Sequence, residues 1–276
     1  MKIVFVTPGF LKRGEAATGF PNYLYRISLA LIEMGHQPII LTAGNWNERR
    51  IERGIDVRTV CVASFKVKNR VLNTLIDYLF TSYALNKELS KIIQSEKIDI
   101  VQFTSLKACA LFYKEKVPAV LRLSSYANLC FRDFLDKSIE EVKMMGFLER
   151  LSARRCNAIF APSQMTANAY AVDCRRKVRV IETPFINDVV EYDNKYINEI
   201  LHNKKYVLYF GKLEKHKGIT VIAEIIEEFL EKNKEYNFVF VGRVENIDGE
   251  NSGAMIKNSS GSSMAKALTF ISSRDM

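Results

Sequence analysis

The chain has 276 residues, of which 48% are hydrophobic and 26% charged, a composition that supports buried cores and excludes a disordered or collagen-like chain. Lys and Arg number 40 against 31 Asp and Glu, and residues 1–203 hold 29 of these basic and 21 of these acidic side chains. The length predicts about two domains, and no stretch approaches the roughly 18 consecutive apolar residues of a membrane-spanning helix.

The first half of the chain alternates between strand and helix patterns. Residues 2–6 (KIVFV) predict a strand. After a polar loop, apolar side chains recur at helical spacing up to Gly35, which is placed to cap a helix; they are Tyr23, Ile27, Ala30, Leu31 and Met34. The pattern then repeats, with strands predicted at 38–42, 55–60, 98–103, 118–123, 158–162 and 178–182, and helices near 71–95, 105–116 and 138–155.

The helix predicted at 138–155 carries its own start signal. Ser138 and Glu141 have the spacing at which a serine and a glutamate satisfy each other's unpaired backbone donors. Apolar residues then recur three apart, which predicts one stripe facing a core; they are Ile139, Val142, Met145, Leu148 and Leu151.

Residues 184–203 are rich in Asn and Asp and lack a clean period, which is typical of a linker. We therefore predict a first domain at 1–183 and a second at 204–276. In the second, strands are predicted at 206–210, 238–242 and 267–271, and a helix at 219–232 with its isoleucines and Phe229 inward. The polar segment after Gly242 predicts a surface loop or a disordered stretch.

Alternating strands and helices indicate an α/β fold with a mostly parallel sheet covered on both faces. Ligands bind such sheets at the carboxyl ends of the strands. The five cysteines are widely spaced and show no CxxC pairing. We interpret them as buried hydrophobic side chains of a reduced, cytoplasmic protein.

The segment from Gly211 to Gly218 (GKLEKHKG) lies between a predicted strand and a predicted helix. Its glycines permit tight turns, the first amides of the following helix favour an anion, and lysines such as Lys212 and Lys217 add full charges. The pattern indicates a site for a diphosphate. A merely solvated lysine loop is the alternative interpretation.

A second glycine-containing segment, Gly14 to Gly19, opens the first long helix. It is placed to admit an anionic group at the helix N-terminus. An ordinary turning loop is the alternative.

Several segments resemble the retaining glycosyltransferases of family 4, which have the two-Rossmann-domain GT-B architecture. The opening KIVFVTPGF with its later "GH" turn, AIFAPSQMTANAY, VIETPFIND and YFGKLEKHKG resemble family motifs in the same order. The resemblance implies a complete N-terminal Rossmann-like domain on the acceptor side, followed by a nucleotide-sugar-binding domain.

The resemblance also implies roles for individual residues. Lys212 and Lys217 would bind the donor diphosphate, and Gly211 and Gly218 would shape that loop. In the family an Arg stands where this chain has Lys212, so the charge is kept and the bidentate fork is lost. Ser124 follows a strand where family members often carry a His. Ser124 and Asn187, in the VIETPFIND segment, are further candidates for the cleft.

The family's paired glutamates, which contact the donor sugar and ribose, lie beyond the strand that ALTFI resembles. A chain ending at Met276 does not reach them. The sequence therefore predicts an incomplete second domain, and a truncated, inactive chain is an alternative to an active enzyme.

The function expected from the resemblance is transfer of a sugar from a nucleotide-diphosphate donor to a glycan or lipid-linked acceptor, with retention. We expect this sugar transfer to take part in cell-envelope or surface polysaccharide synthesis and to need neither a cofactor nor a metal. The net positive charge leaves a different class open, a nucleic-acid or anionic-membrane binding protein without catalysis. Recognition motifs for nucleic acid are missing, so we expect no nucleic-acid partner and allow peripheral membrane contact.

Overall fold

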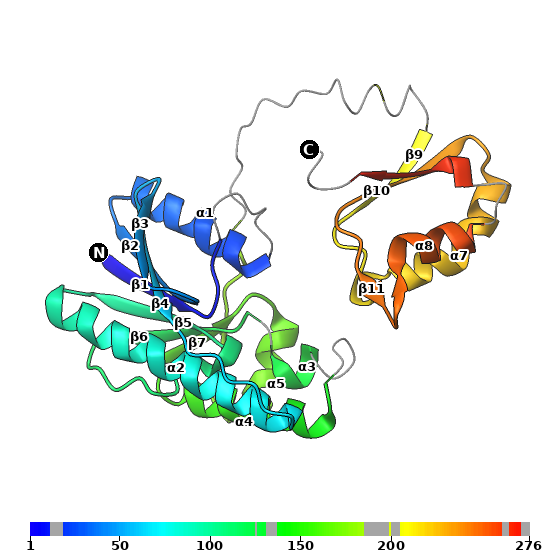
Figure 1. The fold of residues 1–276 in the computed structure, drawn as a ribbon. Helices are drawn as coiled ribbons and strands as arrows, with labels where there is room; N and C mark the ends of the chain where they lie inside the picture. Colours follow the sequence, from blue (N-terminus) through cyan, green and yellow to red (C-terminus); the bar gives the residue numbers. More distant parts are fainter. Residues whose placement is uncertain are drawn as a thin grey trace. The chain divides into compact units, whose positions relative to one another are not determined.

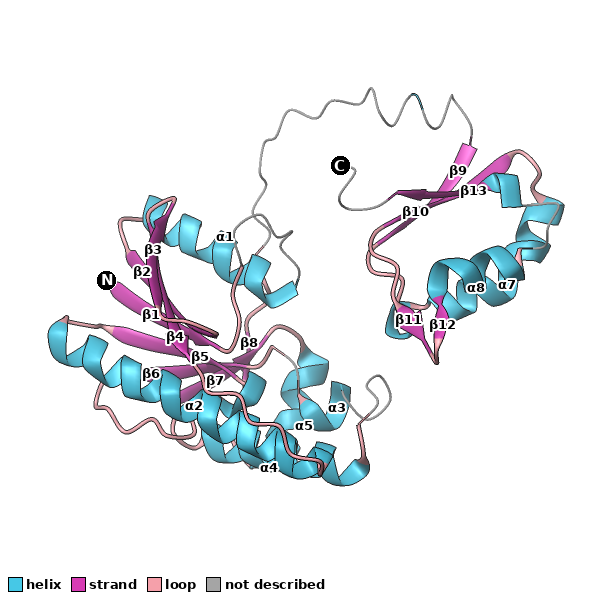
Figure 2. Cartoon of the chain, in the orientation of Figure 1, coloured by secondary structure: helices cyan, strands magenta, loops and turns pink. Residues whose placement is uncertain are grey.

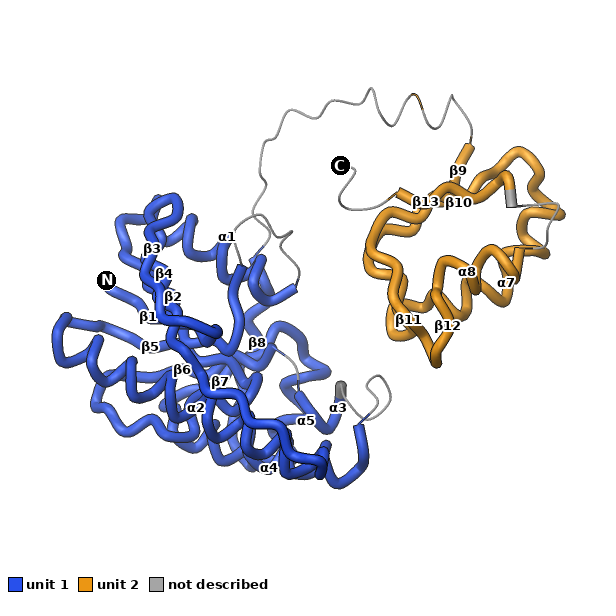
Figure 3. The backbone as a smooth tube through the Cα atoms, viewed as in Figure 1, with its two compact units in different colours: residues 1–187 blue, residues 188–276 orange. Residues whose placement is uncertain are grey.

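The computed structural model describes residues 1–11, 19–124, 126–130, 137–184, 199, 205–260 and 265–271. The chain divides into two compact units, residues 1–187 and residues 188–276 (Figures 1 and 3). Each unit has its own sheet and its own hydrophobic core.

The sheet of the first unit has the strand order β3-β4-β2-β1-β5-β6-β7-β8. All neighbouring strands are parallel except β3 and β4, which are antiparallel. This confirms the predicted α/β class with a mostly parallel sheet. The strands are β1 (Lys2–Thr7), β2 (Gln37–Gly44), β3 (Glu48–Glu52), β4 (Ile55–Cys61), β5 (Ile100–Thr104), β6 (Ala119–Arg122), β7 (Ala158–Ala161) and β8 (Arg179–Val180).

Helices cover both faces of this sheet (Figure 1). Val4 and Val6 point toward the core formed with α2, α4 and α5, whereas Phe5 packs with Leu24 of α1 on the other face. This alternation follows from the two-residue period of a strand. The helices are α1 (Gly19–Glu33), α2 (Arg70–Ser95), α3 (Ala127–Cys130), α4 (Ile139–Ala153) and α5 (Gln164–Cys174).

The helix predicted at 105–116 is wrong. Only a single 3-10 turn, η1 (Leu106–Ala108), forms there, because Lys107 and Ala108 have φ of +52° and +49°, which no right-handed helix accommodates. The edge strand β3 was not predicted, since its polar sequence ERRIE carries no apolar alternation and is stabilised by pairing with β4.

Several apolar side chains of the predicted patterns are exposed, and two of them, Ile139 and Cys61, were predicted to be buried. Met34 is 69% exposed, and the residues of α1 that are buried are Leu24 and Ser28. Ile139 is 64% exposed because it occupies the first turn of α4, whereas the three central residues of that stripe are buried. Cys61 is exposed at the end of β4, although Cys109 and Cys156 are buried as expected.

Two predicted helix ends have the expected caps. Gly35 follows α1 with φ +77°, and the Ser138 hydroxyl accepts a hydrogen bond from the backbone N–H of Glu141 at 3.2 Å. The Glu141 carboxylate, which we expected to accept from the backbone of Ser138, makes other contacts. It accepts hydrogen bonds from Thr74 and Lys137, and thus ties α4 to α2.

The second unit has a parallel sheet of strand order β13-β10-β9, formed by β9 (Lys205–Phe210), β10 (Tyr236–Val241) and β13 (Leu268–Ile271). Helices α7 (Ile219–Lys232) and α8 (Ser252–Ser259) pack on one face. The inward side of α7 includes Ile219 and Ile226, but Ile225 is 50% exposed. Alternate side chains of β9 are exposed, namely Tyr206, Leu208 and Phe210.

Most of the segment after Gly242, predicted as a surface loop or a disordered stretch, forms regular structure between Asn246 and Ser259. A hairpin of β11 (Asn246–Ile247) and β12 (Glu250–Asn251) leads directly into α8 (Figure 2). Asp248 and Gly249 have φ of +51° and +91°, the geometry in which Asp-Gly favours a two-residue hairpin turn. Asn251 then caps α8 by accepting from the N–H of Ala254.

Candidate functional site

The loop after β9 is held in place by a buried side chain at its centre. Leu213 is fully buried, and its backbone N–H donates to the carbonyl of Arg243 at 2.9 Å. Its neighbours Lys212 and Glu214 remain partly exposed. The loop therefore presents charged side chains from a fixed backbone.

The start of the same loop depends on Gly242, which lies outside the loop in the sequence. Gly242, at the end of β10, has φ +152°, and a Cβ there would lie 1.9 Å from the carbonyl oxygen of Gly211. The backbone N–H of Gly211 donates to Val241 at 2.9 Å. The carboxyl ends of β9 and β10 thus approach too closely for any side chain at position 242.

The predicted glycines bracket the loop. Gly211 has φ +140° and Gly218 has φ +80°. Gly218 follows the 3-10 turn η2 (Lys215–Lys217) and directly precedes α7. The amides of the first turn of α7 lack intrahelical partners, and they carry the positive end of the helix dipole. An anion next to this turn would therefore meet oriented N–H donors.

The two predicted lysines differ in their surroundings. The Lys212 ammonium lies 3.2 Å from a carboxylate oxygen of Glu214, and His216 Nδ1 lies 3.1 Å from the other oxygen. The side chain of Lys217 is exposed. Lys215, between them, pairs with the exposed Asp248 at 3.1 Å. The loop is a basic surface that carries one internal carboxylate.

In the first unit, strand order reverses beside β1, because β2 lies on one side of it and β5 on the other. Ligand sites in such sheets lie at the carboxyl ends of these strands. Gly19 is the first residue of α1 at this edge, with φ +55°. It lines a small pocket of about 190 Å³ together with residues of α1, Thr183 and Pro184. Gly14 and Asn187 lie outside the described residues.

Ser124 follows β6 and takes part in a hydroxyl cluster. Its Oγ lies 2.9 Å from Oγ1 of Thr104, and its backbone N–H donates to Ser105 Oγ at 3.3 Å. Arg122 donates to the Ser124 hydroxyl at 3.4 Å. The cluster connects the carboxyl ends of β5 and β6, and it gives Ser124 a defined position at the edge of the sheet.

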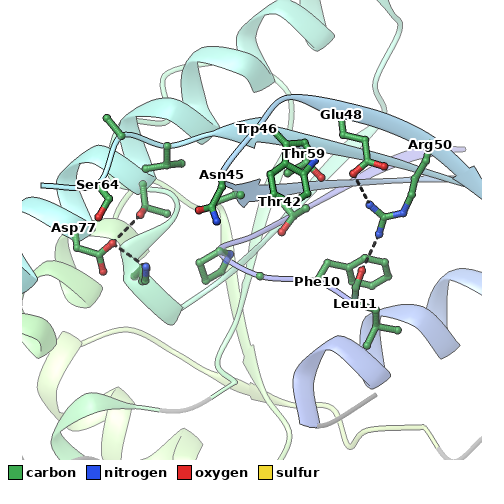
Figure 4. Close-up of a pocket in the computed structure, with 18 residues that line it drawn as sticks. Phe10, Leu11, Thr42, Asn45, Trp46, Glu48, Arg50, Thr59, Ser64 and Asp77 are labelled. Atoms are coloured by element: carbon green, nitrogen blue, oxygen red, sulfur yellow. Dashed lines mark hydrogen bonds and ion pairs between the residues drawn. The ribbon is translucent and has the colours of Figure 1, made fainter. Parts of the chain in front are cut away.

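A larger pocket of about 410 Å³ lies at the carboxyl ends of β1, β2 and β4 (Figure 4). The sole tryptophan of the chain, Trp46, lines it and is 60% exposed. Polar side chains around the pocket include Thr42, Asn45 and Asp77, and Lys107 donates to Asp77 at 2.9 Å. No local sequence pattern indicates this pocket, because its walls come from segments up to 99 residues apart in the chain.

Neither a membrane-crossing helix nor a cluster of three or more metal-binding side chains is found within the described ranges.

Solved structures and a protein-family model match this chain. No curated protein sequence matches the chain. Sucrose-phosphate synthase from Thermosynechococcus elongatus is 14% identical with a TM-score of 0.65, covering 98% of this chain and 70% of that one. UGT2 from Phytolacca americana, complexed with UDP-2fluoro-glucose and pterostilbene, is 12% identical with a TM-score of 0.60, covering 99% and 71%.

A third solved structure, MnaA from S. aureus with UDP, is 15% identical with a TM-score of 0.56, covering 99% of this chain and 69% of that one. At these identities the likeness shows the fold, and it confirms the expected GT-B-like class. The family itself is shown by sequence. The model of Glycosyltransferase Family 4 matches residues 17–185, more than half of the chain. The chain therefore belongs to glycosyltransferase family 4.

Proposed function

We propose that the protein transfers a sugar from a nucleotide-diphosphate donor to an acceptor with retention of the anomeric configuration. The observation that carries this proposal is the family match over residues 17–185. The basic loop between Gly211 and Gly218 supports it, since a leaving diphosphate needs donors of this kind. UDP and a UDP-sugar analogue occur in the MnaA and UGT2 structures.

In the proposed reaction, the bond between the anomeric carbon and the diphosphate oxygen breaks, and the diphosphate leaves with the electron pair. Lys212, Lys217 and the first amides of α7 would stabilise this developing negative charge. Charge-assisted bonds from lysine supply what a bound cation would otherwise supply. We therefore propose a reaction without a metal. An acceptor hydroxyl forms the new bond on the same face of the sugar, and its proton passes to an oxygen of the leaving diphosphate.

For the acceptor, we propose the 410 Å³ pocket of the first unit. The exposed indole of Trp46 offers a flat apolar face for a pyranose ring, and the side chains of Thr42, Asn45 and Asp77 offer hydrogen-bond partners for hydroxyls. A glycan or lipid-linked acceptor used in cell-envelope or surface polysaccharide synthesis has this chemistry.

The test of donor binding is calorimetry with UDP, GDP and ADP on the 276-residue chain. Changing Lys212 or Lys217 to alanine should weaken binding of the preferred nucleotide about tenfold or more each, the usual effect of losing a charged hydrogen bond. Lys232→Ala is the control, because this exposed lysine at the other end of α7 pairs with Glu228. Undiminished binding in the double variant would remove the proposal. Retention is tested by the anomeric configuration of the product in NMR.

A specific surface supports peripheral contact with an anionic bilayer. Phe65, Val67, Leu72 and Phe80 are exposed, and the rings of Phe65 and Phe80 lie 4.9 Å apart. The exposed residues Lys66, Lys68 and Arg70 are interleaved with them in the sequence. Aromatic side chains beside basic ones fit the interface of a bilayer with anionic headgroups. We call these seven residues the aromatic-basic face.

A further inference from the structure

Asp77 of α2 and Lys107 of the 3-10 turn η1 form an ion pair that lines the 410 Å³ pocket, at the left of Figure 4. The Lys107 ammonium lies 2.9 Å from Oδ1 of Asp77, and the two side chains are 36% and 45% exposed. Thr81, one turn further along α2, donates to the same oxygen at 3.4 Å. Both charged groups therefore remain accessible from the cavity.

Other side chains hold this turn against α2. Ser82 Oγ donates to the carbonyl oxygen of Ala108 at 3.0 Å, and the Asn86 amide donates to that of Cys109 at 2.7 Å. Ser82 and Asn86 are 0% and 5% exposed, so water does not compete for these two bonds. A partly exposed ion pair adds little to stability by comparison. The contact between the turn and the helix therefore does not depend on the ion pair.

The ion pair offers a ligand both kinds of hydrogen-bonding group. The bonds from Lys107 and Thr81 both end on Oδ1 of Asp77, so Oδ2 is placed to accept from a ligand. The Lys107 ammonium has three donors and uses one of them on Asp77. A sugar hydroxyl both donates and accepts. Of two adjacent hydroxyls on a ring, one can therefore donate to the carboxylate while the other accepts from the ammonium.

The charges at this end of the pocket balance each other. Among the described residues that line it, the other charged ones are Glu48 and Arg50, which lie 3.4 Å apart at the opposite side of Figure 4. Arg50 also donates to the carbonyl of Leu11 there. An anionic ligand beside the first pair would meet the carboxylate of Asp77, and a cationic one the ammonium of Lys107. Contact between like charges weakens binding, whereas an uncharged, hydroxyl-rich ligand avoids both penalties.

Thr42 provides an independent observation in the same pocket. It is 4% exposed, and its Oγ1 has no hydrogen-bond partner within the described part of the chain. A buried hydroxyl without a partner costs stability, and a ligand hydroxyl in the pocket would supply the missing bond. Thr42 and the exposed indole of Trp46 both lie between the two ion pairs in the view of Figure 4.

We propose that Asp77 and Lys107 bind two adjacent hydroxyls of an uncharged sugar ring, and that Thr42 binds a further hydroxyl of the same acceptor. The proposal rests on the proposed glycosyl transfer and narrows its acceptor to a saccharide whose bound ring is neutral. The ion pair determines this specificity, because it disfavours the carboxylate of a uronic acid and the ammonium of an amino sugar alike.

The test is titration of the intact chain with the methyl glycosides of glucose, galactose and mannose, and with glucuronate and glucosamine, at about pH 6, where an amine is protonated. Trp46 emission and saturation-transfer NMR report binding. At least one neutral glycoside should bind at tens of millimolar or below, and both charged sugars about tenfold or more weakly than it. The proposal is overturned if a charged sugar binds as tightly as the best neutral one, or if no neutral one binds.

Two single variants should shift the preference in opposite directions. Asp77→Asn leaves the ammonium unbalanced and should strengthen glucuronate binding. Lys107→Asn leaves the carboxylate unbalanced and should strengthen glucosamine binding, and asparagine tolerates the φ of +52° at this position. Each should weaken binding of the best neutral glycoside about tenfold. A purely structural ion pair predicts a lower Tm with the preference unchanged, and that result would contradict the proposal.

Glu88→Gln and Lys91→Asn are the controls for charge, because they break an exposed ion pair of 2.7 Å on the same helix. Neither should change the preference among the sugars. Thr42→Val removes the unpartnered hydroxyl and keeps the side-chain shape, so it should weaken neutral glycosides several-fold without lowering Tm. Ser28→Ala is its control, since this buried hydroxyl also lacks a partner among the described residues but does not line the pocket.

The native chain decides the question by itself if a variant does not fold, because the comparison of neutral with charged sugars needs no substitution. UDP affinity, measured in parallel, should be the same in every variant. Binding of neutral glycosides without binding of any nucleotide would contradict the proposed sugar transfer and support this site. Binding of UDP without binding of any neutral glycoside would contradict this site and leave the donor proposal in place.

Discussion

The ammonium of Lys212 lies 3.2 Å from a carboxylate oxygen of Glu214, inside the loop that we propose binds the donor diphosphate. The Lys212 side chain is 37% exposed and that of Glu214 is 22% exposed, so the pair is partly accessible to water and to ligand. A diphosphate that binds Lys212 must displace this carboxylate or share the lysine with it. Glu214 therefore competes with the donor diphosphate for the ammonium of Lys212.

Glu214→Gln should strengthen UDP binding by about threefold to tenfold, since an exposed ion pair is typically worth up to about 1 kcal/mol and a nearby negative charge is also removed. Calorimetry at low and high salt checks this, and the gain should shrink as salt screens the charges. Glu224→Gln makes the same charge change on the exposed side of α7. An equal gain in that control would show that general electrostatics, not this contact, is responsible.

Lys212→Arg should increase UDP affinity several-fold. An arginine binds phosphate oxygens bidentately, whereas the lysine ammonium acts as a compact point charge. The backbone supports the exchange, because Leu213 and Gly218 fix the loop independently of the Lys212 side chain. Titration of the variant with UDP is the measurement. A weaker or equal affinity would indicate that the fork does not reach the diphosphate.

Local sequence patterns predicted those strands and helices whose hydrophobic periodicity is visible in the sequence itself. The parallel strands β1 and β2 contain the apolar runs VFV and PIIL, whose side chains are buried on both faces of the sheet. The 3-10 turn at 106–108 was not predictable in this way. Its left-handed residues Lys107 and Ala108 are held by packing, since Cys109 and Ala110 just beyond them are fully buried.

The residues of the candidate sites also fall into two groups, those with a local sequence signal and those that only the fold brings together. The loop from Gly211 to Gly218 was identifiable because its glycines and lysines are contiguous in the sequence. The hairpin at Asp248-Gly249 also had a local signal, which the polar composition around it concealed. By contrast, Arg122 and Thr183 are 61 residues apart in the chain. Only the winding of the sheet brings such residues together, and no local pattern contains that information.

Trp46 should report acceptor binding directly, because it is the sole tryptophan and lines the larger pocket. Adding a bound acceptor glycan should change its fluorescence intensity and shift its emission to shorter wavelength as water is displaced from the indole. Trp46→Ala should weaken acceptor binding about tenfold, by loss of aromatic contact area, while UDP binding is retained. Saturating acceptor with no change in emission would place the acceptor elsewhere.

We predict that the aromatic-basic face binds membranes that contain anionic lipid. The protein should float with vesicles containing about a third anionic lipid and should not float with neutral vesicles, because basic side chains supply part of the attraction. Phe65→Ser combined with Phe80→Ser should abolish flotation, since both rings are exposed side by side. If flotation is instead lost only on Arg154→Glu with Arg155→Glu, the bilayer binds the end of α4 and not this face.

A buried glutamate gives the last prediction, which concerns stability and pH. Glu149 of α4 is fully buried. Its Oε2 accepts a hydrogen bond from the backbone N–H of Ala127 at 3.1 Å, and its Oε1 has no hydrogen-bond partner in the part of the chain that the structure describes. Burial raises the pKa of this carboxyl to about 8. The folded protein therefore holds a proton at neutral pH that the unfolded chain releases.

Between the unfolded pKa of about 4.5 and the folded value of about 8, the native state binds more protons than the unfolded state. The free energy of unfolding should therefore decrease as pH rises through this window and level off above it. Glu149→Gln keeps an oxygen for the Ala127 bond and cannot ionise. At pH 8.5 it should be more stable than the native protein by an amount of the order of a few kcal/mol, and near pH 4.5 the two should be alike.

Urea unfolding of both proteins at pH 4.5, 6.5 and 8.5 measures this difference, because other titrating groups contribute equally to both and cancel. Glu33→Gln, which alters an exposed carboxylate at the end of α1, should leave the pH dependence as it is in the native protein. A constant difference between Glu149→Gln and the native protein at all three pH values would mean that Glu149 does not titrate in this range, and that its carboxylate is stabilised by a partner other than the Ala127 amide.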